Sequence, residues 1–178
     1  MGLCGRKCRS PIDEWVLDYL NHAILYGEHE LSIDEKNRVL IPIDIRKSLN
    51  PDRDGEKFFI CIGRNKKPWL YPEKYYEHLV SQRQQELTPD EDALAFDQYH
   101  FAMVSLREID AQGRILLPDK TLKRTGTTRE VTLIGARDHL EIWNRSDWEN
   151  RFEQLTESDP KSPKPAKPAI QPAGTNVV

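Results

Sequence analysis

Hydrophobic and polar positions follow the same short pattern at two places in this chain of 178 residues. The first copy runs from residue 32 to 42 and the second from 108 to 118, a constant offset of 76 positions. In both copies an apolar residue and an aspartate are followed by two variable positions, an asparagine or glycine, an arginine, three apolar residues and a proline. A pattern that returns at a fixed spacing indicates one structural unit present twice.

Each copy predicts two short strands joined by a tight polar turn, because the apolar runs on both sides are short and rich in β-branched residues. Asp34 and Asp110 can each accept hydrogen bonds from backbone N–H groups of the turn. Asn37 and Gly113 occupy the same position, and asparagine and glycine are the residues that tolerate a positive φ. These four residues are therefore predicted to shape the turns.

The similarity continues beyond the turns. Pro42 and Pro118 follow the second strand and are predicted in the first turn of a short helix, where the missing backbone N–H costs nothing. Each copy then continues into two further apolar runs, which are at 58–63 and 70–71 in the first copy and at 131–135 and 142–143 in the second. One such β-turn-β-α-β-β copy is too small to bury a good core alone, so the two copies are predicted to interlock.

These stretches resemble the MraZ family, bacterial transcriptional regulators with two tandem SpoVT-AbrB-type domains. The resemblance extends from about Tyr26 to about Leu155, and it is carried by both Asp-x-x-x-Arg turns, by Leu70-Tyr71-Pro72, and by residues 27–34, 131–135 and 141–143. The first turn of the family usually reads Asp-x-Lys-Gly-Arg, and here Asn37 replaces the glycine, which tolerance of a positive φ allows. Gln112 stands where a lysine is often found, so the second turn is less basic.

The resemblance implies an α+β fold, a swapped-hairpin AbrB-like β-barrel built from the two repeats with linker helices outside it. It also implies a ring of several subunits that acts as a sequence-specific transcriptional regulator. The expected targets are short direct repeats in the promoter of the division and cell-wall gene cluster. The expected partners are double-stranded promoter DNA and further copies of the chain, with no membrane and no small-molecule substrate, in the cytoplasm and at the nucleoid.

Six segments are predicted along the chain: an N-terminal extension (1–26), repeat 1 (27–76), a helical linker (77–103), repeat 2 (104–148), the end of a C-terminal helix (149–158) and a disordered Pro/Lys tail (159–178). An apolar stripe in the extension predicts an amphipathic helix over about 11–25. That helix could cover part of the fold or dock a partner, or the start codon could be misassigned. The tail is read as solvated chain or as a weak, non-specific attraction to nucleic acid.

In the linker, Pro72 is predicted to begin a helix whose inner face extends to Leu87. Thr88 is predicted as the N-cap of a second helix, with Pro89 at its first position, that continues to about residue 103.

The net charge of −3 does not by itself indicate a DNA-binding protein. The acidic residues are unevenly placed, however, because residues 86–97 hold five of them and no lysine or arginine. The turns and the helices behind them instead carry cations, which are Lys36, Arg38, Arg46, Lys47, Arg114, Lys120, Lys123 and Arg124. A basic face can therefore exist on an acidic chain.

Catalysis, a metal site and a cofactor are not expected. The five histidines are not at ligand spacing, no glycine-rich phosphate loop is present, and no serine lies in a nucleophile-elbow context. Cys4, Cys8 and Cys61 indicate neither a disulfide nor a metal site. No apolar run is long enough to span a bilayer.

Lys36, Arg38 and Arg114 are the predicted DNA-binding residues, because cations on a rigid turn suit phosphate contact and arginine suits bidentate contact to guanine. For the two arginines an internal salt bridge to Asp34 or Asp110 is an equally good interpretation. The alternative function is a ring-forming protein-interaction module without specific DNA binding, which the net charge and Gln112 keep open.

Overall fold

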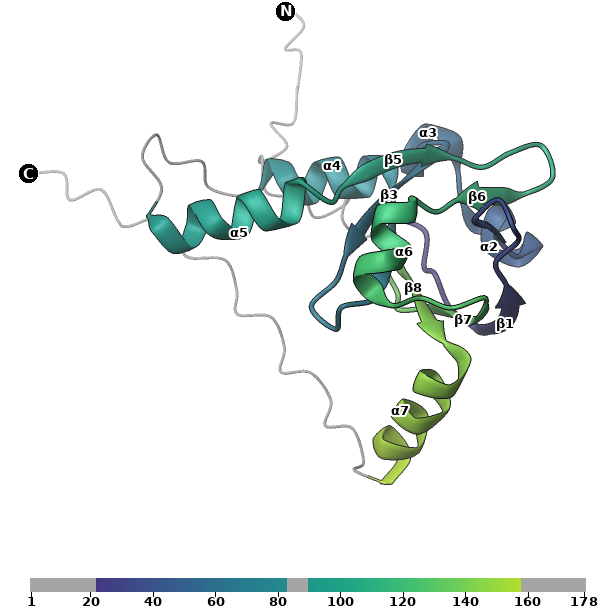
Figure 1. Ribbon diagram of the computed structural model, residues 1–178. Helices are drawn as coiled ribbons and strands as arrows, with labels where there is room; N and C mark the ends of the chain where they lie inside the picture. Colours follow the sequence, from purple (N-terminus) through teal and green to yellow (C-terminus); the bar gives the residue numbers. More distant parts are fainter. Residues whose placement is uncertain (1–21, 83–89, 158–178) are drawn as a thin grey trace, which may run out of the picture.

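A computed structural model describes residues 22–82 and 90–157, and its body is a six-stranded antiparallel sheet (Figure 1). The strand order is β1-β7-β8-β4-β3-β5, and a separate two-stranded sheet is formed by β2 and β6. The strands are β1 Glu28–Ser32, β2 Arg38–Leu40, β3 Lys57–Ile62, β4 Pro68–Pro72, β5 Ser105–Glu108, β6 Arg114–Leu116, β7 Glu130–Gly135 and β8 Leu140–Asn144. The mixed α+β class predicted from the sequence is confirmed.

Strands of the two copies pair with each other, in addition to the β3–β4 and β7–β8 pairs between neighbours in sequence. Strand β1 of the first copy pairs with β7 of the second, and β5 of the second copy pairs with β3 of the first. In the small sheet β2 pairs with β6, and Val39 lies opposite Ile115. Neither copy therefore forms its sheet alone, and the two predicted turns are brought together by the β2–β6 pairing.

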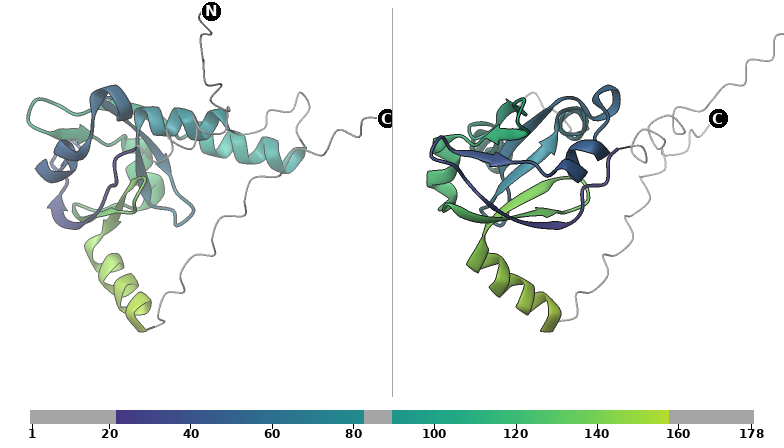
Figure 2. Two further views of the ribbon diagram at one scale, coloured as in Figure 1. Left: turned by 180° about the vertical axis from the view of Figure 1, so that it is seen from behind. Right: turned by 90° about the vertical axis from the view of Figure 1, so that its right-hand side faces the viewer.

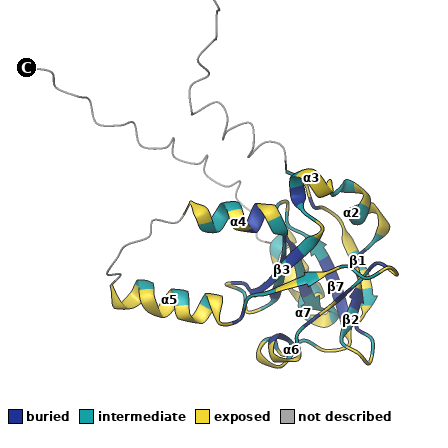
Figure 3. Cartoon of the chain, turned by 90° about the horizontal axis from the view of Figure 1, so that it is seen from above, coloured by how far each residue is buried: buried dark blue, intermediate teal, exposed yellow. Residues whose placement is uncertain are grey.

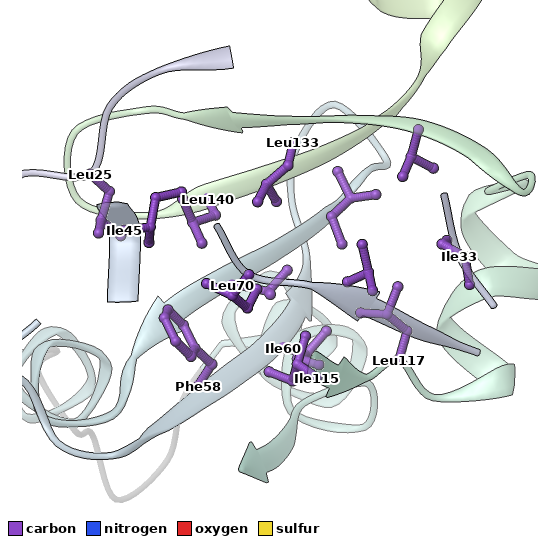
Figure 4. Close-up of a cluster of buried hydrophobic side chains, with 14 of the residues drawn as sticks. Leu25, Ile33, Ile45, Phe58, Ile60, Leu70, Ile115, Leu117, Leu133 and Leu140 are labelled. Atoms are coloured by element: carbon purple, nitrogen blue, oxygen red, sulfur yellow. The ribbon is translucent and has the colours of Figure 1, made fainter. Parts of the chain in front are cut away.

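The helices lie outside the sheets. They are α2 Ile43–Ser48, α3 Pro51–Asp54, α4 Glu73–Ser81, α5 Glu91–Phe101, α6 Asp119–Thr125 and α7 Arg145–Glu157. Helices α5 and α7 project from the body in different directions, as the views in Figures 1 and 2 agree. The core between the sheets is made by side chains from both copies, including Ile60, Leu70, Ile115, Leu133 and Leu140 (Figure 4).

One buried carboxylate ties the chain before β1 to the body. Asp54, at the end of α3, is fully buried and accepts hydrogen bonds from the backbone N–H groups of Ala23 (3.1 Å) and Asn50 (2.8 Å). The Arg53 guanidinium lies 2.7 Å away and compensates the buried charge. Helix α3 was not predicted, because its Asn50-Pro51 start forms only one turn.

The predicted helix over 11–25 is wrong for residues 22–25, and residues 1–21 lie outside the described part of the chain. Leu25 instead forms an antiparallel bridge with Arg137, with N···O distances of 2.7 and 2.8 Å in the two directions. This pairing uses the Leu25 backbone N–H and C=O that a helix would need for its own hydrogen bonds.

Several predicted helix ends are shifted. The N-cap of α5 is Asp90, whose carboxylate accepts a hydrogen bond from the Ala93 N–H at 2.7 Å, and not Thr88, which with Pro89 and Leu87 lies outside the described residues. The prolines before α2, α4 and α6 occupy the position just before the first helical residue, one place earlier than predicted. Helix α5 ends at Phe101 and α7 begins at Arg145.

The β2–β6 pair supports a direct stability prediction. Ile115→Ala removes a fully buried side chain opposite Val39, and we expect a decrease of roughly 2–4 kcal/mol in the free energy of unfolding. Leu116→Ala, on the next residue, which is 45% exposed, should change it by less than about 1 kcal/mol. Urea titration of both variants followed by circular dichroism checks this, and equal decreases would contradict the burial argument.

Candidate nucleic-acid interface

The first turn is held by one carboxylate. Asp34 accepts hydrogen bonds at its Oδ1 from the backbone N–H groups of Lys36 and Arg38, both at 2.9 Å. Its Oδ2 accepts from Nε of Arg38 at 2.8 Å and lies 2.7 Å from Nη2. Asn37 adopts a φ of 60°, and its N–H donates to the Asp34 carbonyl at 2.9 Å. The turn is therefore fixed by its own side chains.

The second turn repeats this geometry. Asp110 accepts from the backbone N–H groups of Gln112 and Arg114, both at 2.9 Å, and from Nε and Nη2 of Arg114 at 3.1 and 2.9 Å. Gly113 has a φ of 81°, and a Cβ there would lie 2.7 Å from Cζ of Arg46. Glycine suits this turn because of the positive φ, and a side chain here would displace the Arg46 guanidinium.

Ion pairs connect the two turns. Nη1 of Arg114 lies 3.6 Å from Oδ2 of Asp34, and Nη1 of Arg38 lies 4.0 Å from Oδ2 of Asp110. We call these four residues the charge quartet. Backbone hydrogen bonds strengthen the link, because the Ile41 N–H donates to the Gly113 carbonyl and the Leu117 N–H donates to the Asn37 carbonyl, both at 2.8 Å.

The quartet affects the titration of its carboxyl groups. Hydrogen bonds from the Arg38 side chain and backbone lower the pKa of Asp34 to about 2. The backbone N–H of Arg114, together with its side chain, also lowers the pKa of Asp110. Both aspartates are thus held as charged acceptors, and both arginines have the internal partners that the sequence left as an alternative.

Lys36 differs from the arginines. Its side chain is exposed and makes no hydrogen bond or ion pair with any residue in 22–82 or 90–157. At the equivalent place in the second turn, the Gln112 side-chain oxygen accepts a hydrogen bond from Nη2 of Arg114. The first turn therefore presents a free cation, whereas the second turn presents a neutral side chain bonded to its own arginine.

Sequence reasoning missed one cation beside the first turn and misjudged another beside the second. Nη1 of Arg129 donates to the backbone carbonyls of Asp34 and, at 3.3 Å, of Ile33. Arg46 was expected only as one of the cations on the helices behind the turns, but its Nε donates to the Ile41 carbonyl at 2.9 Å and its guanidinium packs on Gly113. Only the β1–β7 pairing, which local patterns do not reveal, brings Arg129 to the turn.

A hollow of about 420 Å³ lies between the first turn and the end of α6. Its lining includes Asn37, Lys123, Thr127, Thr128 and Arg129. Lys123 is exposed and pairs with Asp119 at 2.7 Å, so it is also engaged locally. The hollow therefore places Arg129 and Lys123 beside the first turn, together with the apolar Ile33 and Leu122.

No group of three His, Cys, Asp or Glu side chains within residues 22–82 and 90–157 could hold a metal ion. Cys61 is buried, and burial raises the pKa of its thiol to about 12, so a reactive thiolate is not formed near neutral pH. Cys4 and Cys8 lie outside the described residues.

Because of the charge quartet, we expect the folded state to become less stable in acid. Because the folded state lowers the pKa of Asp34 from 3.8 to about 2, this stabilisation is present above pH 3.8 and disappears as the pH falls toward 2. Asp34→Asn should lower the thermal unfolding midpoint at pH 7 and weaken the decline in this acidic range. The control is Glu35→Gln, an exposed carboxyl of the same turn. Melting curves for Asp34→Asn and the unmodified protein that stay parallel down to pH 2 would refute the prediction.

Comparison with known proteins agrees with these features. A family profile described as "MraZ protein, putative antitoxin-like" matches residues 24–97 and 101–167. The chain is 33% identical over 127 residues to the transcriptional regulator MraZ of Acetivibrio thermocellus, which covers 71% of this chain and 85% of that protein. It is 30% identical to the proteins of the same name from Lachnoclostridium phytofermentans (74% of this chain, 89% of that protein) and Clostridium tetani (74% and 93%). Both Asp-x-x-x-Arg turns lie inside the matched regions, and the chain belongs to the MraZ family.

Proposed function

We propose that this protein is a sequence-specific DNA-binding transcriptional regulator. It acts as an oligomeric ring on direct repeats in the promoter of the division and cell-wall gene cluster. The observation that carries the proposal is the surface made by the two joined turns, residues 34–38 and 110–114, which we call the basic edge. On this edge Lys36 is exposed and unpaired among the described residues. The name shared by the related proteins, transcriptional regulator MraZ, supports the same function.

The fold proposed for this edge is the swapped-hairpin AbrB-like barrel. The pairing of β1 with β7, of β5 with β3 and of β2 with β6 supports it, because each copy contributes strands to the other. In this proposal repeat 1 covers residues 27–76 and repeat 2 covers 104–148, and the linker between them holds the end of α4 and all of α5. The quartet then holds the two repeats together at the DNA-binding edge.

Each cation of the edge has its own role in the proposal. Lys36 contacts a backbone phosphate directly, since its ammonium is free to do so. Arg38 and Arg114 keep 28% and 25% of their side chains exposed, so guanidinium donors can reach DNA while the aspartates hold their orientation. Asp34, Asn37, Asp110 and Gly113 shape the turns and do not contact bases.

A ring explains how a chain with a net charge of −3 can bind DNA tightly. One subunit offers a small basic edge, and several linked edges contact successive direct repeats. Each further contact then forms at a high effective concentration, so weak individual contacts combine into a strong one.

The proposed partners are promoter DNA and other copies of the chain, in the cytoplasm and at the nucleoid, with no substrate, membrane contact or catalytic role. Among the described residues, no helix has both the length and the apolar character needed to cross a bilayer.

Lys36→Ala tests the proposal, with Lys74→Ala as a matched control on α4, away from the turns. We expect Lys36→Ala to weaken binding to the promoter repeats at least about tenfold, because every subunit that engages DNA then binds one phosphate fewer. The slope of log K against log salt should become shallower by about 0.9 for each phosphate that is no longer bound. Fluorescence anisotropy over a salt series, with a scrambled duplex as reference, measures both quantities.

Lys74→Ala should bind as the unmodified protein does, since it removes the same charge elsewhere. Equal, weak binding of the unmodified protein to the promoter and the scrambled duplex would reject the regulator proposal. It would favour the alternative of a ring-forming protein-interaction module without specific DNA binding.

A further inference from the structure

Helix α5 exposes an apolar stripe that faces away from the body. It contains no buried residue, in contrast to α4 (Figure 3). Leu94 and Phe101 are 46% and 42% exposed, and the neighbouring Ala95 and Ala102 are exposed as well. Positions 94, 95, 101 and 102 fall on one side of a helix, because seven residues make almost two turns. We call these four residues the outer stripe.

The other side of α5 contacts β4 and α4 of the same chain. Phe96, Tyr99 and His100 line a cavity of about 200 Å³ against Trp69 and Tyr71 of β4. Nε2 of His100 also lies 3.0 Å from the Tyr76 hydroxyl of α4. Helix α5 is therefore apolar on two opposite sides, and its own chain covers one of them only in part, since Phe96 and Tyr99 remain 46% and 55% exposed. A contiguous exposed apolar surface often marks an interaction site, so the outer stripe is a candidate contact surface.

A groove of matching character lies at another place on the molecule, between α7 and the strands β7 and β8. Its volume is about 510 Å³. The apolar part of its lining is Ile134, Ala136, Trp143, Trp148 and Leu155, and the polar part is Asn65, Glu141 and Arg151. We call it the α7 groove. Glu141 is occupied internally by hydrogen bonds with Trp143 (2.6 Å) and Asn65 (2.9 Å) and by His139 at 3.2 Å.

Arg151 of the groove is opposite in charge to the first turn of α5. The first turn of α5 carries exposed Glu91 and Asp92, and the outer stripe begins next to them. Arg151 lies in the groove lining on the same side of α7 as Trp148 and Leu155.

The remaining charges near the groove fit the same arrangement. Three acidic residues of α7, Glu149, Glu153 and Glu157, recur every four positions on the opposite side of that helix, and Asp147 is paired with Lys67 at 2.5 Å. Arg64 and Lys66, exposed on the β3–β4 turn beside Asn65, add positive charge near the groove.

We propose that the outer stripe of α5 docks into the α7 groove of a second copy of this chain, with Glu91 and Asp92 of one copy facing Arg151 of the other. This inference rests on the self-association in the proposed function and names the surfaces that make it. Stripe and groove are different surfaces, so each copy can engage two neighbours. Contacts of this kind close into a ring when the rotation between neighbours permits it.

The test uses the full-length chain and measures molar mass by size-exclusion chromatography with light scattering. The stripe variant is Leu94→Glu with Phe101→Glu, and the groove variant is Arg151→Glu with Leu155→Glu. Leu106→Glu on β5 and Glu153→Lys on the far side of α7 serve as matched controls for an added charge. Circular dichroism confirms that each variant is folded before its mass is compared.

We expect the unmodified protein to form an assembly, and the stripe and groove variants each to have the mass of one chain. An equimolar mixture of these two variants should have the mass of two chains, because one intact groove and one intact stripe remain. Both controls should keep the unmodified mass. This mixing result distinguishes a stripe-in-groove contact from two unrelated effects on assembly.

Three results would overturn the inference. A stripe variant with unmodified mass would mean that something else covers α5, and a lowered melting temperature in that variant would point to residues 1–21 of the same chain. A mixture that stays at the mass of one chain would show that stripe and groove do not bind each other. A monomeric unmodified protein would remove self-association, and the promoter titration would still decide DNA binding separately.

Discussion

The structure depends on the pairing of β2 with β6, which brings two turns 76 residues apart in sequence into contact. Once these strands pair, Val39 and Ile115 are fully buried between the two halves, and the flanking arginines come within 4 Å of the aspartates of the opposite turns. The same pairing sets the backbone hydrogen bonds that link Ile41 to Gly113 and Leu117 to Asn37. The contact between the two turns and the position of the basic edge therefore follow from one strand pairing.

The quartet illustrates why an Asp-x-x-x-Arg turn can be structural and functional at once. A carboxylate that accepts two backbone N–H bonds fixes the turn, and the arginine that neutralises it is held in one orientation at the surface. An arginine with a fixed orientation loses less conformational entropy when it meets a phosphate or a base than a free one does. Pairing with Asp34 therefore does not compete with the proposed role of Arg38. A free lysine such as Lys36 contributes charge but less geometric definition.

How much the sequence could predict depended on the range of the interactions involved. The turns were predictable because Asp34 and Asn37 act on their immediate neighbours, and the observed φ of Asn37 is the one its residue type suggested. Strand partners were not predictable locally, so Arg129 was missed although it contacts the first turn. Thr88 was predicted as the N-cap of α5, whereas the carboxylate of Asp90, two residues later, is the one that bonds to the helix. Leu25 lies in a bridge because a distant strand turn supplies Arg137, which no helical periodicity could indicate.

The proposed interface and the proposed DNA-binding edge are mechanically connected. Helix α5 leads through the buried Met103 into β5, which is hydrogen-bonded to β3 along Ser105–Glu108 and ends directly at the second turn. A short segment fixed in this way has little freedom to change the distance between α5 and Gly113. If neighbouring copies dock through α5, the spacing between their basic edges is then set by the protein and not by the DNA. Direct repeats whose spacing matches that of the edges would bind all edges together, and repeats with another spacing would require the DNA to deform. Selectivity could therefore come from the geometry of the assembly in addition to base contacts by the turns.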